Sequence, residues 1–374
     1  MNTLLNRRQW LKAAGATLAA TALAPRLSLR ADPLPAPSAP AAAPGLVQLS
    51  WNENPFGPSP SAQRAMQVAV GRSCRYPDAE EEELLRLIAA REGCPTSQIV
   101  LGNGSGEILD AAGFHFGYEK GEIIAANPSY MQLVVAAEKA GGAAVRIPLN
   151  ARLEHDLPAM AAAVGPRTSL VYIVNPNNPT GTVCEAAELR EFVRTVSARV
   201  PVFIDEAYLE CTDDFAGRTC AGLATSGHNV VVARTFSKIF GMAGCRLGYA
   251  VLPEKLAASL RARMTGSLSL TTIMAGIASL GDTAYVTATR AKLKAGREAL
   301  MAQARALGRE YTAAQGNFAF IKTGMPVQDF VKKMRAEGVI VGRPFPPLLE
   351  WARITVGLPE EMETCHRALR KVLG

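Results

Sequence analysis

Through its middle, the chain alternates short runs of β-branched and apolar residues with longer amphipathic segments. This alternation is typical of βαβ units that build a mainly parallel sheet. The predicted strands are 98–103, 121–127, 143–149, 169–175, 200–205, 230–235 and 246–252. Helices are predicted between them at 106–117, 130–140, 156–164 and 185–198. We therefore expect an α/β fold whose large domain, residues 76–253, carries a mostly parallel seven-stranded sheet.

The pattern changes to long helices after residue 253. Helices are predicted at 254–264, 270–308, 326–337 and 359–373, the second with a break near Gly281 and Asp282, and short strands at 317–322, 339–342 and 352–357. With 374 residues, 48% of them hydrophobic, the chain is long enough to bury two cores. Residues 254–374 are therefore expected to form a smaller α+β domain, and residues 46–75, with little strand signal, are expected to pack on it.

The N-terminus has the features of an export signal. Arg7 and Arg8 precede a short alanine-rich apolar run that ends near residue 24 and is too short to span a bilayer stably. We interpret residues 1–24 as a twin-arginine signal peptide and the Pro- and Ala-rich residues 25–45 as a linker. The alternative is a basic amphipathic helix. Under the first reading, the protein folds in the cytoplasm, is exported to the periplasm and has no stable membrane insertion after processing.

The charge of the chain gives no support for nucleic-acid binding. Residues 1–32 carry five basic side chains and one acidic one, so their removal lowers the formal charge from +7 to +3. The seven cysteines and four histidines show no spacing typical of a metal site. The sequence therefore predicts neither a nucleic-acid partner nor a bound metal.

Four motifs lie at the C-terminal ends of predicted strands. They are GNGSGEIL at 102–109, NPNNPTG at 175–181, FIDEAY at 203–208 and TFSKIFGMAGCRLGY at 235–249. Ligands of open α/β sheets bind outside the carboxyl ends of the strands, so the four motifs are expected to meet in one crevice.

Two of these motifs could bind an anion and supply a nucleophile. A phosphate fits beside Gly104, Ser105 and Gly106, where a glycine-rich turn opens a helix, although a plain capped turn explains the same residues. Burial and Arg246 would keep the Lys238 amine neutral and nucleophilic. Candidate phosphate ligands in the same stretch are Thr235, Ser237 and Arg246.

The other two motifs could hold a nitrogen heterocycle. Asp205 ends a buried strand, where a carboxylate needs a partner such as a protonated ring nitrogen. A helix cap or a magnesium site is the alternative, but the phosphate-binding loop that accompanies such magnesium sites is absent from the sequence. Asn178 and Tyr208 could contact a ring oxygen. Together with the amine and the phosphate cradle, these are the contacts that pyridoxal 5′-phosphate requires.

From about residue 46 onward, the chain resembles the class I/II aminotransferases of fold type I, and within them the histidinol-phosphate aminotransferase branch. The motifs that carry the resemblance are NENPFGPS (52–59), RYPD (75–78), GNGSGE (102–107), NPSY (127–130), NPNNPTG (175–181), DEAY (205–208), TFSK (235–238), GMAGCRLGY (241–249) and WARITVG (351–357). The resemblance implies transfer of an amino group between an L-amino acid, or an amine like histidinol phosphate, and a 2-oxo acid. It also implies a ping-pong mechanism and a homodimer with shared active sites.

The resemblance also implies a role for each matching residue. Lys238 would hold the cofactor covalently and move a proton, and Asp205 would pair with the ring nitrogen. Tyr130 would stack on the ring. The phosphate would be bound by Gly104, Ser105, Thr235, Ser237 and Arg246, and by Tyr76 of the neighbouring subunit. Arg353, with Asn52 nearby, would bind the substrate carboxylate.

The chain departs from the branch after its GVIV strand. An arginine often follows that strand directly, whereas this chain has Gly342 there and Arg343 one place later. Arg343 is therefore a candidate substrate-binding residue in a side-chain pocket that differs from that of the branch. A decarboxylase or lyase with the same cofactor, similar to the threonine-phosphate decarboxylases, is an alternative activity, and a non-catalytic binding protein is a third.

Overall fold

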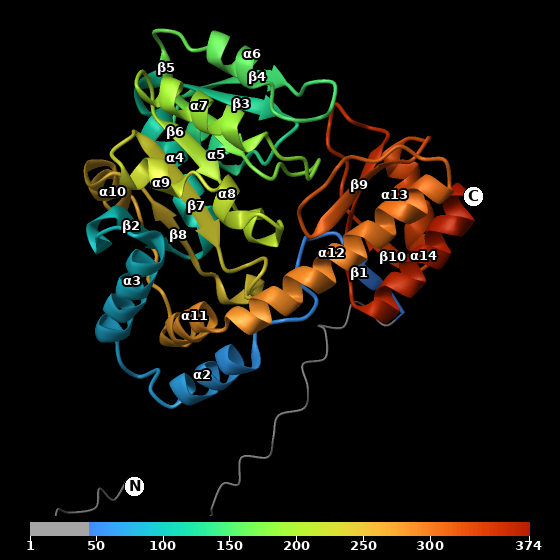
Figure 1. The fold of residues 1–374 in the computed structure, drawn as a ribbon, viewed down its shortest axis with the longest axis horizontal. Coiled ribbons are helices and arrows are strands. Elements are labelled where there is room, and N and C mark those ends of the chain that lie inside the picture. Colours follow the sequence, from blue (N-terminus) through green and yellow to red (C-terminus); the bar gives the residue numbers. More distant parts are fainter. Residues whose placement is uncertain (1–44) are drawn as a thin grey trace, which may run out of the picture. The chain divides into compact units, whose positions relative to one another are not determined.

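The computed structural model describes residues 45–374 (Figure 1). The predicted signal at 1–24, and the predicted linker up to residue 44, lie outside the described residues. Within the described range, the elements fall into a seven-stranded sheet with its helices and a smaller group around two short sheets.

The seven-stranded sheet has the order β2-β8-β7-β6-β5-β3-β4. Its strands are β2 (Ile99–Gly102), β3 (Glu122–Asn127), β4 (Ala143–Pro148), β5 (Thr168–Val174), β6 (Val202–Asp205), β7 (Val230–Thr235) and β8 (Gly248–Val251). All neighbours pair in parallel except β8, which runs antiparallel to both β2 and β7. The expected α/β fold with a mostly parallel sheet is therefore confirmed.

Helices cover both faces of this sheet, because successive side chains of a strand point to opposite faces. Val202 and Ile204 of β6 belong to one buried cluster, which includes α7 residues, whereas Phe203 belongs to the other, which includes α4 and α5 residues. The helices near the sheet are α3 (Asp78–Glu92), α4 (Gly104–Gly117), α5 (Gln132–Lys139), α6 (Leu157–Ala162), α7 (Ala186–Ser197), α8 (Phe215–Arg218), α9 (Ala221–Thr225) and α10 (Glu254–Arg261). Short 3-10 turns are η2 (Thr96–Gln98), η3 (Tyr118–Lys120), η4 (Leu209–Cys211) and η5 (Ala243–Cys245).

The C-terminal part contains two small sheets. Strand β9 (Phe318–Lys322) pairs antiparallel with β11 (Trp351–Thr355), and β10 (Val339–Val341) pairs in parallel with β1 (Val47–Leu49). The helices of this part are α12 (Thr283–Ala306), α13 (Val327–Ala336) and α14 (Pro359–Leu373). The expected break in the long helix is present, because Asp282 follows α11 (Leu270–Gly281) and its side chain caps α12 by accepting the Tyr285 N–H at 3.2 Å.

Residues 46–75 contact both groups of elements. Strand β1 joins β10, but α2 (Pro60–Val70) packs against α11, which also packs against α3. Helix α10 likewise packs against α4 and β2. Helices α10 and α11, the first two after residue 253, thus pack against elements that precede residue 253, and the division at 253/254 stays a prediction. Within residues 45–374, no helix combines the length and hydrophobicity that a membrane crossing requires.

Candidate active site

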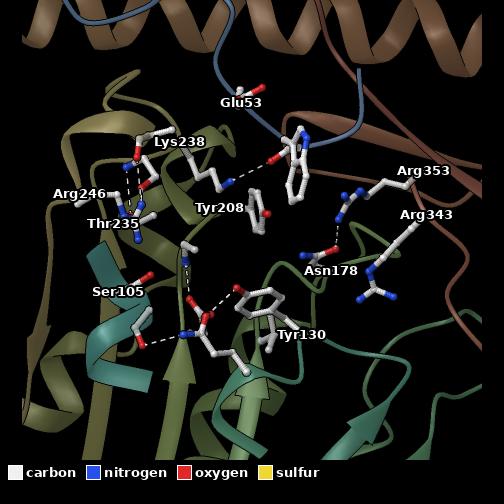
Figure 2. A pocket seen from close by; sticks show the side chains of 18 of the residues that line it. Glu53, Ser105, Tyr130, Asn178, Tyr208, Thr235, Lys238, Arg246, Arg343 and Arg353 are labelled. Carbon is white, nitrogen blue, oxygen red and sulfur yellow. Dashed lines mark hydrogen bonds between the residues drawn. The ribbon is translucent and has the colours of Figure 1, made fainter. Parts of the chain in front are cut away.

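A cavity of about 340 Å³ opens at the carboxyl ends of β5, β6 and β7 (Figure 2). All four motifs that follow predicted strands contribute to its lining. Predicted residues on the cavity are Ser105, Gly106, Tyr130, Asn178, Asp205, Tyr208, Thr235, Ser237, Lys238, Arg246, Arg343 and Arg353. Residues on the cavity that the sequence analysis missed include Trp51, Glu53, Gln132 and Phe345. Trp51 and Glu53 flank Asn52, so the NENPFGPS motif was a usable signal for them.

Asp205 is a buried carboxylate without a cationic partner among the described residues. It is 2% exposed at the end of β6, where its Oδ1 accepts the Ala207 N–H at 3.0 Å and its Oδ2 accepts the Tyr172 hydroxyl at 3.5 Å. Burial raises the pKa of Asp205 to about 6, against the opposing effects of the Ala207 hydrogen bond and Lys238. A positively charged ring nitrogen in the cavity would supply the missing partner.

The adjacent carboxylate, Glu206, is satisfied within the protein. Its Oε2 lies 3.2 Å from Nε of the buried Arg234, and its Oε1 accepts the Cys220 N–H at 2.7 Å. Arg234 also pairs with Glu92 of α3 at 2.7 Å. Of these two neighbouring acids, only Asp205 therefore remains available to a ligand.

Lys238 presents its amine to the cavity under conditions that favour the neutral form. Its Nζ donates to the Asn52 carbonyl at 3.0 Å and lies 5.3 Å from the centre of the Tyr208 ring. Burial, followed by the positive charge of Arg353, lowers the pKa of Lys238 to about 8. The main positive charge that acts on this amine is thus Arg353, on a different sheet, and not Arg246 as expected from the sequence.

Arg246 instead belongs to an anion-binding side of the cavity. Its guanidinium donates to the Ala243 carbonyl at 3.0 Å and to the Ser237 hydroxyl at 3.4 Å. A Cβ at Gly104 would stand 2.2 Å from this guanidinium, so the left-handed Gly104 lets the arginine lie against the first turn of α4. Ser105 and Gly106 present the helix N-terminus to the cavity, and Thr235 and Ser237 add hydroxyl groups.

Arg353 and Arg343 supply positive charge on the opposite side (Figure 2). Arg353, 7% exposed on β11, donates to the Asn178 Oδ1 at 2.5 Å and to the Ser50 carbonyl at 2.6 Å, and its buried Nε has no partner among the described residues. The Arg343 guanidinium lies 4.6 Å from the centre of the Phe345 ring. Among residues 45–374, no carboxylate pairs with either arginine. Both could therefore bind anionic groups of a substrate.

The remaining predicted residues lie in different places. The hydroxyl of Tyr130 donates to Gln132 Oε1 at 2.8 Å beside the cavity. Asn52 does not line the cavity; its amide donates to the Tyr208 hydroxyl at 2.9 Å. Tyr76 is 92% exposed and away from the cavity, so a contact with a cofactor would need a second copy of the chain. The roles proposed for these three residues stay predictions.

The residues on the cavity fit pyridoxal 5′-phosphate. The unpaired Asp205 suits its ring nitrogen, the Lys238 amine suits its aldehyde, and the donors around Arg246 suit its phosphate. The Tyr208 hydroxyl and the Asn178 amide lie between these groups and Arg353, where they can meet the ring oxygen. The ring nitrogen, the aldehyde and the phosphate of one small molecule thus each have a complementary group on the same cavity.

Comparison with known proteins agrees with this chemistry. The chain is 37% identical over 333 residues to a histidinol-phosphate aminotransferase of Moorella thermoacetica. This match covers 88% of this chain and 86% of that protein. It is 38% identical over 336 residues to histidinol-phosphate aminotransferase 2 of Ralstonia nicotianae, covering 88% and 89%.

A solved structure and a family profile give the same result. The histidinol-phosphate aminotransferase of Sinorhizobium meliloti, solved in complex with pyridoxal-5′-phosphate, superposes with a TM-score of 0.79 at 25% identity, covering 88% of this chain and 91% of that one. The profile of the aminotransferase class I and II family matches residues 44–371. With the cavity chemistry, these similarities show that the chain belongs to the class I and II aminotransferase family.

Proposed function

We infer that this chain is a pyridoxal-phosphate-dependent aminotransferase that moves an amino group between an amino acid, or an amine resembling histidinol phosphate, and a 2-oxo acid. One observation carries this conclusion. The Lys238 amine with its lowered pKa, the buried Asp205 carboxylate without a cationic partner among the described residues, and the anion-binding groups around Arg246 all line one cavity. The related histidinol-phosphate aminotransferases support transamination over the alternative decarboxylase or lyase activity.

When bound, pyridoxal phosphate supplies an aldehyde for exchange with amines and a ring that accepts electron density from the substrate Cα. The protein positions this chemistry. Arg246 and the N-terminus of α4 would bind the phosphate, and Asp205 would hold a proton at the ring nitrogen. Arg353 would bind the substrate carboxylate, and the Lys238 amine would take the proton from Cα.

A donor panel tests the proposed activity. Purified protein is incubated with 2-oxoglutarate and single donors, including histidinol phosphate, aromatic amino acids and dicarboxylic amino acids, and both oxo-product and carbon dioxide are measured. We expect an oxo-product without carbon dioxide from at least one donor. Carbon dioxide as the main product would support the decarboxylase alternative and contradict the proposed transamination.

The surroundings of Gly342 bear on the choice of donor. A Cβ at this position would lie 2.9 Å from the Arg353 carbonyl and 3.2 Å from the Arg353 Cβ, so a side chain there would press on the carboxylate-binding arginine. The arginine after strand β10 is instead Arg343, whose guanidinium lies over the Phe345 ring. We propose that Arg343 binds the distal part of the substrate, and the donor panel shows which distal groups it accepts.

The lowered pKa of Lys238 predicts how cofactor capture depends on pH. Only the neutral amine attacks an aldehyde, and burial places the pKa at about 8 instead of the 10.5 of a free lysine. The rate at which cofactor-free protein captures pyridoxal phosphate, followed by absorbance, should therefore rise with pH to a midpoint near 8. Arg353→Leu should move this midpoint upward, because it removes a positive charge. A midpoint near 10.5 in the unaltered protein would contradict the expected environment.

Arg353 should matter chiefly for substrate binding. Arg353→Lys keeps the charge but loses the planar pair of donors, so we expect the KM for every amino donor to rise about tenfold, with a smaller change in kcat. Steady-state kinetics with several donors measure this. Arg343→Lys is the matched control and should alter KM for some donors only. Equal KM values for Arg353→Lys and the unaltered protein would exclude the carboxylate-binding role.

A homodimer with shared active sites is part of the proposal. Tyr76 and Trp51 are large side chains with exposed fractions of 92% and 71%, and Trp51 lines the cavity. In the proposed dimer, Tyr76 of each chain contacts the phosphate in the active site of the other chain. Sedimentation should then give twice the mass of one chain, and Tyr76→Phe should weaken cofactor binding. A monomer with full activity would disprove the shared site.

Export by the twin-arginine route is also proposed, on the sequence of residues 1–24 alone. Changing Arg7 and Arg8 together to lysine should keep the protein in the cytoplasm, because the route reads the arginine pair. Changing Arg26 and Arg30 to lysine is the matched control and should leave export intact. Fractionation of bacteria that express the three chains measures the outcome, and equal periplasmic yields would contradict the proposal.

A further inference from the structure

A buried hydrogen-bond chain fixes which way the Tyr208 hydroxyl can donate. Thr355, at the end of β11, lies next to Asn52 of the N-terminal segment, and Asn52 lies next to Tyr208. All three side chains are more than nine-tenths buried. Neither Thr355 nor Asn52 lines the cavity, whereas Tyr208 does, so the hydroxyl of Thr355 and the side-chain amide of Asn52 reach the cavity through Tyr208.

The direction of each hydrogen bond follows from the chemistry of the groups. The Asn52 backbone N–H can only donate, and it reaches the Thr355 Oγ1 at 3.0 Å. The Thr355 hydroxyl is thus left to donate its own hydrogen to the Asn52 Oδ1 at 3.1 Å. This bond places the amide oxygen toward Thr355 and the amide nitrogen toward Tyr208, where Nδ2 donates to the hydroxyl at 2.9 Å.

Tyr208 is thereby left with a free hydrogen. Burial raises the pKa of the phenol to about 12, so the hydroxyl keeps its proton near neutral pH. Because its oxygen already accepts from Asn52, the remaining hydrogen is available to an acceptor in the cavity. With a reversed Asn52 amide, the carbonyl oxygen would instead compete for that hydrogen.

The backbone conformation and the hydrogen bonds of its carbonyl group hold Asn52 in place beside Tyr208. Its φ of 55° lies in the left-handed region, which asparagine tolerates better than most residues. Its carbonyl accepts from Lys238 Nζ at 3.0 Å and from the buried Asn317 Nδ2 at 2.9 Å. The same residue therefore supports both the amine and the phenol of the site.

We propose that Thr355 is a positioning residue, whose hydroxyl orients the Asn52 amide so that Tyr208 donates its hydrogen into the cavity. The proposal rests on the proposed function, since the acceptor is the ring oxygen of pyridoxal phosphate. It predicts that the Thr355 hydroxyl affects the cofactor only while Tyr208 carries a hydroxyl.

A double-mutant cycle tests this coupling. Thr355→Val keeps the shape of the side chain but removes the hydroxyl, and Thr355→Ser keeps the hydroxyl. Cofactor affinity is measured by titrating cofactor-free protein with pyridoxal phosphate, and the absorbance of the bound cofactor is followed against pH. We expect Thr355→Val to weaken binding about tenfold and to shift the pH midpoint of absorbance, and Thr355→Ser to stay within about twofold.

The Tyr208→Phe background separates positioning from folding. There, Thr355→Val should change affinity by less than about threefold, because the hydroxyl it orients is gone. An equal loss in both backgrounds would show a structural role and overturn the proposal, as would normal affinity of Thr355→Val. If that variant fails to fold, Thr355→Ala carries the same expectation. If the unaltered protein binds no pyridoxal phosphate, the proposed function fails and this inference fails with it; normal binding with an insensitive Thr355 overturns the inference alone.

Discussion

The Lys238→Ala variant is expected to lose transamination by at least about 10⁴-fold, because it removes both the covalent anchor and the group that moves the proton. Nothing in the cavity can replace the amine: Lys238 is the only lysine on the cavity lining among the described residues. Burial lowers the pKa of Arg353 to about 10, so this guanidinium still carries its proton at neutral pH and does not act as a base.

The same variant should remain folded. Burial disfavours the charged amine, as its lowered pKa of about 8 shows, so removing it leaves no unpaired charge behind. We expect an unfolding temperature close to that of the unaltered protein, loss of the absorbance of lysine-bound cofactor, and turnover below detection. Lys332→Ala, at an exposed position on α13, is the matched control and should behave normally. Substantial turnover by Lys238→Ala would remove the assignment.

Asp205→Asn should produce the second largest effect, a slowing of proton abstraction on the order of 10²-fold. The amide is nearly the same size as the carboxylate but cannot hold a proton at the ring nitrogen by charge. Among the described residues, no cationic side chain pairs with Asp205, so its charge is available to the ring nitrogen. Glu206, by contrast, is paired with Arg234.

Single-turnover kinetics with a donor deuterated at Cα measure the effect of Asp205→Asn. We expect a larger isotope effect in the variant, because proton abstraction then limits the rate. Asp213→Asn, at a surface ion pair with Lys294, is the control and should leave the rate unchanged. An unaltered rate for Asp205→Asn would contradict the role given to this carboxylate.

Much of the fold could be predicted from the sequence because its signals are local. The β-branched runs of β5 and β7 are buried on both faces of the sheet. Asp282 indicates the break between α11 and α12, because its side chain caps the start of α12. Helix α3 was missed because four consecutive glutamates fill its first half and most of its apolar residues are grouped in the second half, so it lacks the periodicity of an amphipathic helix. Strand β1 was missed because it has three residues and depends on pairing with the distant β10.

The site shows the same division between local and long-range information. Asp205 and Lys238 could be predicted because Asp205 ends β6 and Lys238 closely follows β7, and the carboxyl ends of both strands lie at the same edge of the sheet. The cation that lowers the pKa of Lys238 could not be predicted, because Arg353 lies on β11, which belongs to a separate sheet. The link from Thr355 through Asn52 to Tyr208 likewise joins three segments far apart in sequence, and no local pattern indicates it.

The central claim is that the Lys238 amine captures the aldehyde of pyridoxal phosphate. It is tested most directly by reducing the loaded protein with borohydride, digesting it and locating the fixed cofactor by mass spectrometry. The account predicts one major adduct, on the peptide that contains Lys238, and its loss when an amino donor is added before reduction. No adduct, or an adduct at other lysines only, would contradict the account.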